Sequence, residues 1–183
     1  TRGLKNGDLV EFEDKMLEAT LGPGLLSSSY DGLQNDLTTM DGVFLKRGEY
    51  TSPLNHEKVW DFTPIAKPGD KVVAADWLGE VKEGWLPHKI MVPFAFKGEY
   101  TVKSIEKAGQ YNIDKVIAVL TNAEGEDVNV TMYQKWPVKV AIKGYKDKPR
   151  PSKIMETGVR AIDTLNPIAE GGTGFIPGPF GCG

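Results

Sequence analysis

The sequence has very little of what metal centres and disulfide frameworks require. Its 183 residues include one cysteine and two histidines. The single thiol, Cys182, cannot form an intrachain disulfide, and His56 and His88 are too few and too far apart in the sequence for a zinc cluster. No nucleophile motif accompanies either histidine, so we expect both to lie at the surface or in structural hydrogen bonds. The sequence therefore favours neither a metal centre nor a disulfide scaffold.

An excess of positive charge and a long apolar run are also absent. The formal net charge is −3, with 22 Lys and Arg against 25 Asp and Glu, so no basic field favours a nucleic-acid partner. Apolar runs such as residues 116–120 are far shorter than the roughly 20 residues that span a bilayer, and no signal peptide opens the chain. These features predict an intracellular protein without a nucleic-acid partner.

Glycine and proline are plentiful, at 21 and 12 residues, which favours many turns and few long helices. From about Phe44 to Val138, short runs of strand-forming residues alternate with turns, a pattern typical of a compact antiparallel sandwich or barrel. Residues 122–127 are predicted to form a hairpin connection in which Gly125 has a positive φ. The expected strands are residues 58–63, 71–73, 77–81, 88–92, 98–104, 115–120 and 128–132.

The flanking segments have other patterns. Residues 6–12 alternate apolar and charged side chains, which predicts a half-buried strand. Residues 21–26 form a breaker-rich crossover, and residues 31–37 are compatible with a short helix that carries two leucines on one face. Charged residues and prolines in residues 145–151 indicate a linker at a domain boundary.

After this linker the pattern becomes that of an α/β protein. Apolar residues recur every three positions after Thr157 and stop before Pro167, which predicts a short helix capped by Thr157. Arg160 and Asp163 would form a surface ion pair on it. Residues 175–176 predict a short buried strand that leads into a glycine-rich loop. A helix, a strand and a glycine loop in this order indicate the start of a nucleotide-binding sheet.

Gly178 and Gly183 have the spacing of the two glycines in the phosphate-binding loop G-x-x-x-x-G-K-[ST]. Glycines there let backbone N–H groups turn inward around an anion, and a following helix adds the positive end of its dipole. The lysine that reaches the phosphates and the hydroxyl that binds magnesium would both come after Gly183. The spacing by itself also fits an ordinary surface turn.

Taken together, several segments resemble the catalytic A subunit of the vacuolar/archaeal-type (V/A-type) rotary ATPases. Residues 156–183, with Pro177-Gly178-Pro179-Phe180-Gly181-Cys182-Gly183, are similar to that family's approach to its P-loop, and the chain would end inside this loop. Departures occur at Asn35-Asp36, where Arg-Pro is usual, and at Val159, where Gln is common. Earlier segments resemble the same subunit in the same order: residues 21–26, 30–34, 54–62, 88–93 and 134–138.

The resemblance implies a mixed β and α/β fold in four parts. Residues 1–18 would end an N-terminal β-barrel, and residues 19–43 would form a connection and the first part of the nucleotide-binding domain. Residues 44–138 would be an inserted β-rich bulge domain with a barrel-sandwich-like fold. Residues 139–183 would continue the RecA-like P-loop nucleotide-binding domain up to the P-loop.

The resemblance also implies an ATP hydrolase that couples ATP hydrolysis to H⁺ or Na⁺ transport, with ATP and Mg²⁺ as ligands of the complete subunit. The expected partners are B subunits in an alternating hexameric ring, a central rotor stalk and a peripheral stalk, in a cytoplasmic sector peripheral to a membrane. This chain would hold no catalytic residue and no metal ligand, and alone it is expected to be inactive. The residues expected at the nucleotide are Gly178, Pro179, Phe180, Gly181, Cys182 and Gly183.

Two other functions stay open on the residues alone. The β-rich region could be a non-catalytic assembly or binding module, or a biotinyl- or lipoyl-like carrier domain with Lys89 as the modified lysine. Pro87 and Pro93 argue against the tight two-residue turn that a carrier needs at Lys89. Cys182 could be a small buried apolar residue, whereas the resemblance implies a thiol beside the phosphates that is sensitive to thiol reagents.

Overall fold

The structure is a computed structural model that describes residues 3, 5–12, 16–40, 42, 44, 48–143, 147 and 150–181. The chain divides into two compact units, residues 1–144 and residues 145–183. Among the described residues there are ten strands and one short helix. The protein is therefore β-rich with almost no helix.

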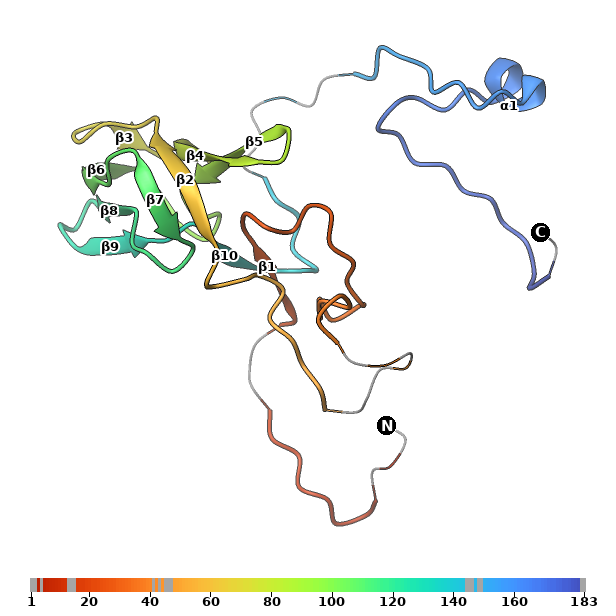
Figure 1. Ribbon diagram of the computed structural model, residues 1–183, viewed down its shortest axis with the longest axis horizontal. Helices are drawn as coiled ribbons and strands as arrows, with labels where there is room; N and C mark the ends of the chain where they lie inside the picture. Colours follow the sequence, from red (N-terminus) through yellow and green to blue (C-terminus); the bar gives the residue numbers. More distant parts are fainter. Residues whose placement is uncertain are drawn as a thin grey trace. The chain divides into compact units, whose positions relative to one another are not determined.

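Two four-stranded antiparallel sheets form the body of the first unit (Figure 1). One sheet has the strand order β5-β4-β2-β7 and the other the order β3-β6-β8-β9. This arrangement confirms the predicted sandwich or barrel of short antiparallel strands. The strands of the first sheet are β2 (Val59–Pro64), β4 (Trp77–Glu83), β5 (Leu86–Met91) and β7 (Gly109–Asn112). Those of the second are β3 (Lys71–Val72), β6 (Tyr100–Ile105), β8 (Ala118–Thr121) and β9 (Asp127–Val130).

Alternation of apolar and polar residues places one face of each strand in the core. In β2, Trp60 and Phe62 are buried, whereas Val59 and Asp61 are exposed. The β8–β9 connection is the predicted hairpin, in which Gly125 has φ +84°. Both sheets contribute to the core, whose largest fully buried side chains include Phe62, Leu78, Val81, Val102, Ile113, Ile117, Leu120 and Val130.

A bulge interrupts β4 beside the Phe62 ring of the neighbouring strand β2. The register of the β4–β5 pair shifts between Trp77 and Gly79, so both Leu78 and Gly79 point into the protein. A Cβ on Gly79 would lie 2.5 Å from the Phe62 ring carbon Cζ and 2.8 Å from the Thr63 carbonyl oxygen. Only glycine fits this position without displacing β2.

The first unit also contains a separate two-stranded ribbon. It pairs β1 (Glu18–Leu21) with β10 (Gln134–Pro137) in antiparallel register. Neither strand was among the expected strands, and β7 was also missed. All three are four residues long and lack a clear apolar alternation, so their pairing depends on neighbours that are distant in the sequence.

The strand expected at residues 6–12 is wrong in this structure. These residues form no strand, and Leu9, Val10 and Phe12 are 102%, 64% and 82% exposed. A strand of this length needs a neighbour to accept its backbone hydrogen bonds. Residues 6–12 have no strand partner among the described residues.

The helix expected at residues 31–37 is also wrong, because Asp31 competes for the backbone. Its carboxylate accepts hydrogen bonds from the Leu33 and Asn35 backbone N–H groups at 2.9 and 2.8 Å and from the Asn35 side-chain amide at 2.8 Å. The Asn35 amide holds the pKa of Asp31 below its ordinary value. Gln34 has φ +64°, so the segment folds as a turn that an Asp side chain stabilises.

The second unit contains the predicted helix as α1 (Arg160–Leu165), which ends at Asn166. The helix begins after Val159, not after Thr157. Asp163 does not pair with Arg160: its carboxylate accepts hydrogen bonds from Thr157 Oγ1 at 2.6 Å and from the Gly158 N–H at 3.0 Å. The hydroxyl of Thr157 thereby holds the pKa of the Asp163 carboxyl below its ordinary value.

Residues 171–181 come after α1 and contain neither helix nor strand (Figure 1). The buried strand expected at residues 175–176 is wrong, because Phe175 is 86% exposed and Ile176 is 93% exposed. Two apolar residues are too few to become buried unless their segment joins a sheet as a strand. Among the described residues of this unit, Ile154 and Ala169 form a β-bridge with backbone hydrogen bonds beside it.

Gly79→Ala should destabilise the first unit by about 1–3 kcal/mol, because the added methyl group overpacks the site beside Phe62. Gly32→Ala is the matched control, since a Cβ there meets nothing within 4 Å, and its effect should stay within about 0.5 kcal/mol. Urea unfolding of both variants measures the difference. Equal stability of the two variants would contradict the close packing at Gly79.

Candidate functional site

The expected phosphate loop lies in the extended part of the second unit. Of its six residues, Gly178, Pro179, Phe180 and Gly181 are described, and Cys182 and Gly183 lie outside the described residues. Phe180 is fully exposed, and Gly181 has φ +90°, a conformation that glycine adopts readily. The described part of the loop offers backbone groups and no charged side chain.

The residues present do not fit a Mg²⁺ site. Residues 174–181 carry no hydroxyl, carboxylate or lysine side chain, whereas Mg²⁺ is held by hard oxygen ligands. Across the described part of the chain, no group of three or more His, Cys, Asp and Glu side chains could hold a metal ion. Residues 174–181 therefore offer no side-chain ligand to Mg²⁺.

The glycine-rich segment 22–26 packs directly against the β-rich body. A Cβ on Gly22 would lie 2.8 Å from Tyr133 Cβ and 3.0 Å from Leu54 Cδ1. Leu25 packs against the buried core. The segment that the sequence predicts as a simple crossover is thus held tightly on the barrel.

Glu83 fixes the backbone of this segment from the end of β4. Its Oε1 accepts hydrogen bonds from the backbone N–H groups of Gly24 at 2.6 Å and Leu26 at 3.2 Å. Its Oε2 lies 2.8 Å from His88 Nδ1. The Glu83 side chain is only 7% exposed, so a buried carboxylate compensates two backbone donors that would otherwise lack an acceptor. Sequence reasoning missed Glu83, although a glutamate two residues after buried Val81 stands at an inward position of the strand.

A second set of hydrogen bonds ties residues 30–36 to the β1 strand and to the start of the barrel. The Gln34 amide donates to the Thr20 carbonyl and accepts from the Thr20 N–H, both at 2.7 Å. The Tyr30 hydroxyl donates to the Pro53 carbonyl at 2.8 Å. The two segments that carry much of the resemblance, residues 21–26 and 30–34, are therefore both anchored on the β-rich body.

The two histidines take part in structural hydrogen bonds, in line with the expectation from the sequence. His56 contacts Asp114 at 2.9 Å and Ser52 at 3.2 Å, and His88 contacts Glu83. The Ser52 hydroxyl beside His56 donates to the Leu54 carbonyl at 2.8 Å. Because its proton is directed to the backbone, the pair of Ser52 and His56 is not arranged as a nucleophile and its base.

Lys89 lies within β5 and not at a hairpin tip. It is paired in register with Glu80, and its ammonium contacts the Glu80 carboxylate and lies 4.8 Å from the Trp77 ring centroid. The hairpin turn is at Gly84 and Trp85. A carrier lysine needs an accessible turn, so the position of Lys89 argues against a carrier domain.

Comparison with known proteins agrees with the β-rich architecture. Residues 51–139 match the family model described as the ATPsynthase alpha/beta subunit barrel-sandwich domain. The whole chain is 50% identical to the V-type ATP synthase alpha chain of Borreliella burgdorferi (strain ZS7), 52% identical to that of Borrelia turicatae (strain 91E135) and 47% identical to that of Treponema denticola.

The chain belongs to the V-type ATP synthase alpha-chain family. It spans about a third of the length of these relatives, 32% in each case. The described part of this alpha-chain region holds no helix with the length and apolar character needed to cross a bilayer.

Glu83→Ala should lower the free energy of unfolding of this alpha-chain region by roughly 2–4 kcal/mol, because two partly buried backbone N–H groups lose the buried carboxylate that accepts their hydrogen bonds. Glu80→Ala is the control on the same strand: its ion pair with Lys89 is partly exposed, so about 0–1 kcal/mol is expected. Urea denaturation of both variants measures the effect. A loss no greater for Glu83→Ala than for Glu80→Ala would contradict the role of Glu83.

Proposed function

We propose that the complete subunit is the catalytic subunit of a rotary ATPase that couples ATP hydrolysis to H⁺ or Na⁺ transport across a membrane. The observation that carries this proposal is the identity of about 50% to V-type ATP synthase alpha chains over the whole of this chain. The matched barrel-sandwich domain at residues 51–139 supports it. In this proposal the chain is one part of a larger catalytic unit.

The loop at residues 178–183 has the role of the first half of the P-loop. Gly178, Pro179, Phe180 and Gly181, followed by Cys182 and Gly183, would lie against the nucleotide phosphates through their backbone. The lysine, the magnesium-binding hydroxyl and the group that orients the attacking water would come from the RecA-like domain after Gly183. Mg²⁺ would supply charge neutralisation at the phosphates when bound with ATP.

The partners in this proposal are B subunits that alternate with the catalytic subunits in a hexameric ring, together with a central rotor stalk and a peripheral stalk. The sector would lie in the cytoplasm at the membrane surface, and this chain would contact the membrane only through the other subunits. The name ATP synthase, which the relatives carry, supports a multisubunit machine that binds nucleotide.

The β-rich body would serve in this machine as a rigid support. It has its own core from both sheets, and through Glu83 it fixes the backbone of residues 24–26. This self-contained core also favours a second candidate, a non-catalytic assembly or binding module. The two candidates differ in whether nucleotide binding depends on residues 178–183 and on the rest of the P-loop beyond Gly183.

The chain should bind Mg-ATP far more weakly than a version extended through the lysine and hydroxyl residue of the P-loop and the helix behind them. The short chain offers only part of the anion-binding backbone and neither side chain. Isothermal titration calorimetry on the two proteins, with Mg-ADP as a second ligand, measures the difference. Equal affinity would show that residues 178–183 are not the nucleotide site and would favour the binding module.

A further inference from the structure

Two cavities lie on either side of Trp60, between the segment 23–28 and β2. One, of about 520 Å³, is bounded by Ser27, Lys82 and Trp85. The other, of about 560 Å³, is bounded by Thr38, Ser52 and His56. Both lie in the first unit, and neither contains residues of the expected phosphate loop.

Four residues line both cavities: Gly24, Ser28, Lys58 and Trp60. The side chains of the last three present hydrogen-bond donors, and none has an acceptor among the described residues. Trp60 is only 5% exposed, and its buried indole Nε1 has no hydrogen-bond partner there. The Lys58 ammonium lies 4.1 Å from the Trp60 ring centroid and forms no ion pair with a described carboxylate.

The carboxylates that line the two cavities accept hydrogen bonds from other groups. Glu83 accepts hydrogen bonds from two backbone N–H groups and contacts His88. Asp61 accepts a hydrogen bond from the Gln110 amide at 3.0 Å, and Asp36 accepts two from Thr38. None of these carboxylates accepts a hydrogen bond from the three donors. The Trp60 indole N–H is the buried one among them, and buried donors in native proteins nearly always have an acceptor.

We propose that the groove over Trp60, formed by Ser28, Lys58 and Trp60, binds a compact oxyanion of the phosphate type. The anion is either free phosphate or the terminal phosphoryl group of a nucleotide. A tetrahedral oxyanion offers several acceptor oxygens at once, so it matches a hydroxyl, an ammonium and an indole N–H better than water does. Lys82 at the edge of one cavity adds a second positive charge.

Gly24 and Ser28 line both cavities together with Trp60. A Cβ on Gly24 would lie 3.6 Å from Trp60 Cζ2, so a side chain at residue 24 would crowd this edge of the ring. Because Nε1 is buried, anion binding requires a small shift of the atoms that cover it. The indole N–H reports directly on that shift and on the new hydrogen bond.

The test is a titration of the ¹⁵N-labelled 183-residue chain with sodium phosphate, followed by ¹H–¹⁵N correlation NMR. Sodium chloride keeps the ionic strength constant, because unspecific screening affects all charged groups. The four tryptophans give four indole signals, and Trp60→Phe assigns the one of interest. We expect a saturable shift of the Trp60 indole. The signal of the Trp136 indole N–H should not shift, because this group donates a hydrogen bond to the Val140 carbonyl at 2.7 Å.

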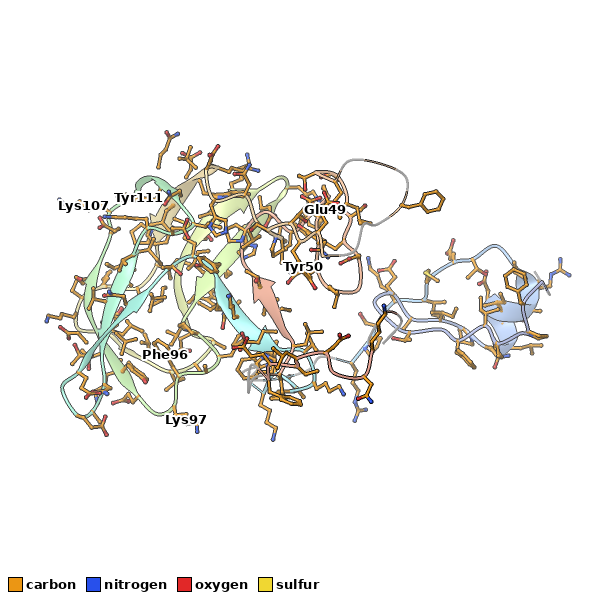
Figure 2. All side chains as sticks on the ribbon, turned by 90° about the horizontal axis from the view of Figure 1, so that it is seen from below. Glu49, Tyr50, Phe96, Lys97, Lys107 and Tyr111 are labelled. Atoms are coloured by element: carbon orange, nitrogen blue, oxygen red, sulfur yellow. The ribbon has the colours of Figure 1, made fainter. Side chains whose placement is uncertain are left out.

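Matched variants connect the shift to the groove. Lys58→Met should weaken the apparent phosphate affinity by about tenfold or more, because a charge-assisted hydrogen bond is lost, and Ser28→Ala should weaken it less. Lys97→Met is the control, since Lys97 lies on the loop between β5 and β6 (Figure 2) and lines neither cavity. It should leave the affinity unchanged.

A parallel titration with metal-free ATP distinguishes the two sources of the anion. Shifts of the Trp60 indole by both ligands, each reduced by Lys58→Met, indicate recognition of any phosphoryl group, and a shift by phosphate alone indicates the free anion. A Trp60 indole that neither ligand moves would overturn the proposal. Equal losses of phosphate affinity in Lys58→Met and Lys97→Met would overturn it as well. So would signal shifts confined to the backbone amides of Gly178 and Gly181.

Discussion

The contact between β2 and the bulged strand β4 is the constraint on which the rest of the first unit depends. The Phe62 ring fills the space that the missing side chain of Gly79 leaves, so it packs directly on the backbone of β4. The bulge also turns Leu78 and Gly79 inward together and keeps Val81 and Glu83 on the core side. The burial of Glu83, and thus its hydrogen bonds to residues 24 and 26, depends on this register.

The anchoring of residues 22–26 links the β-rich body to the segments through which this family is recognised. Gly22 allows the backbone to approach Tyr133 and Leu54. The Glu83 carboxylate accepts a hydrogen bond from the backbone N–H of Gly24 in the same segment. In the proposed rotary ATPase subunit, this connection would hold residues 22–26 firmly on the β-rich body. The proposed anion groove lies under the same connection, since Gly24 and Ser28 line both of its cavities.

The sequence predicts most of the barrel and little of its surroundings. Strands such as β2 and β8 carry alternating or continuous apolar residues, and Gly125 marks a hairpin turn, so local pattern is sufficient there. β1 and β10 could not be found in this way, because each pairs with a strand more than a hundred residues away. The turn at Asp31 was missed because a side chain competes with the helix, and Glu83 gave no signal beyond its inward position.

Native-state hydrogen exchange on the 183-residue chain tests the central claim most directly, namely that the barrel core, through Glu83, holds the backbone of residues 22–26. We predict that the amides of Gly24 and Leu26 exchange as slowly as those of β2 and β4, because they open only when the barrel does. The amides of residues 173–176, which belong to no helix or strand, should exchange much faster. Rapid exchange at Gly24 and Leu26 while β2 and β4 remain protected would contradict this claim.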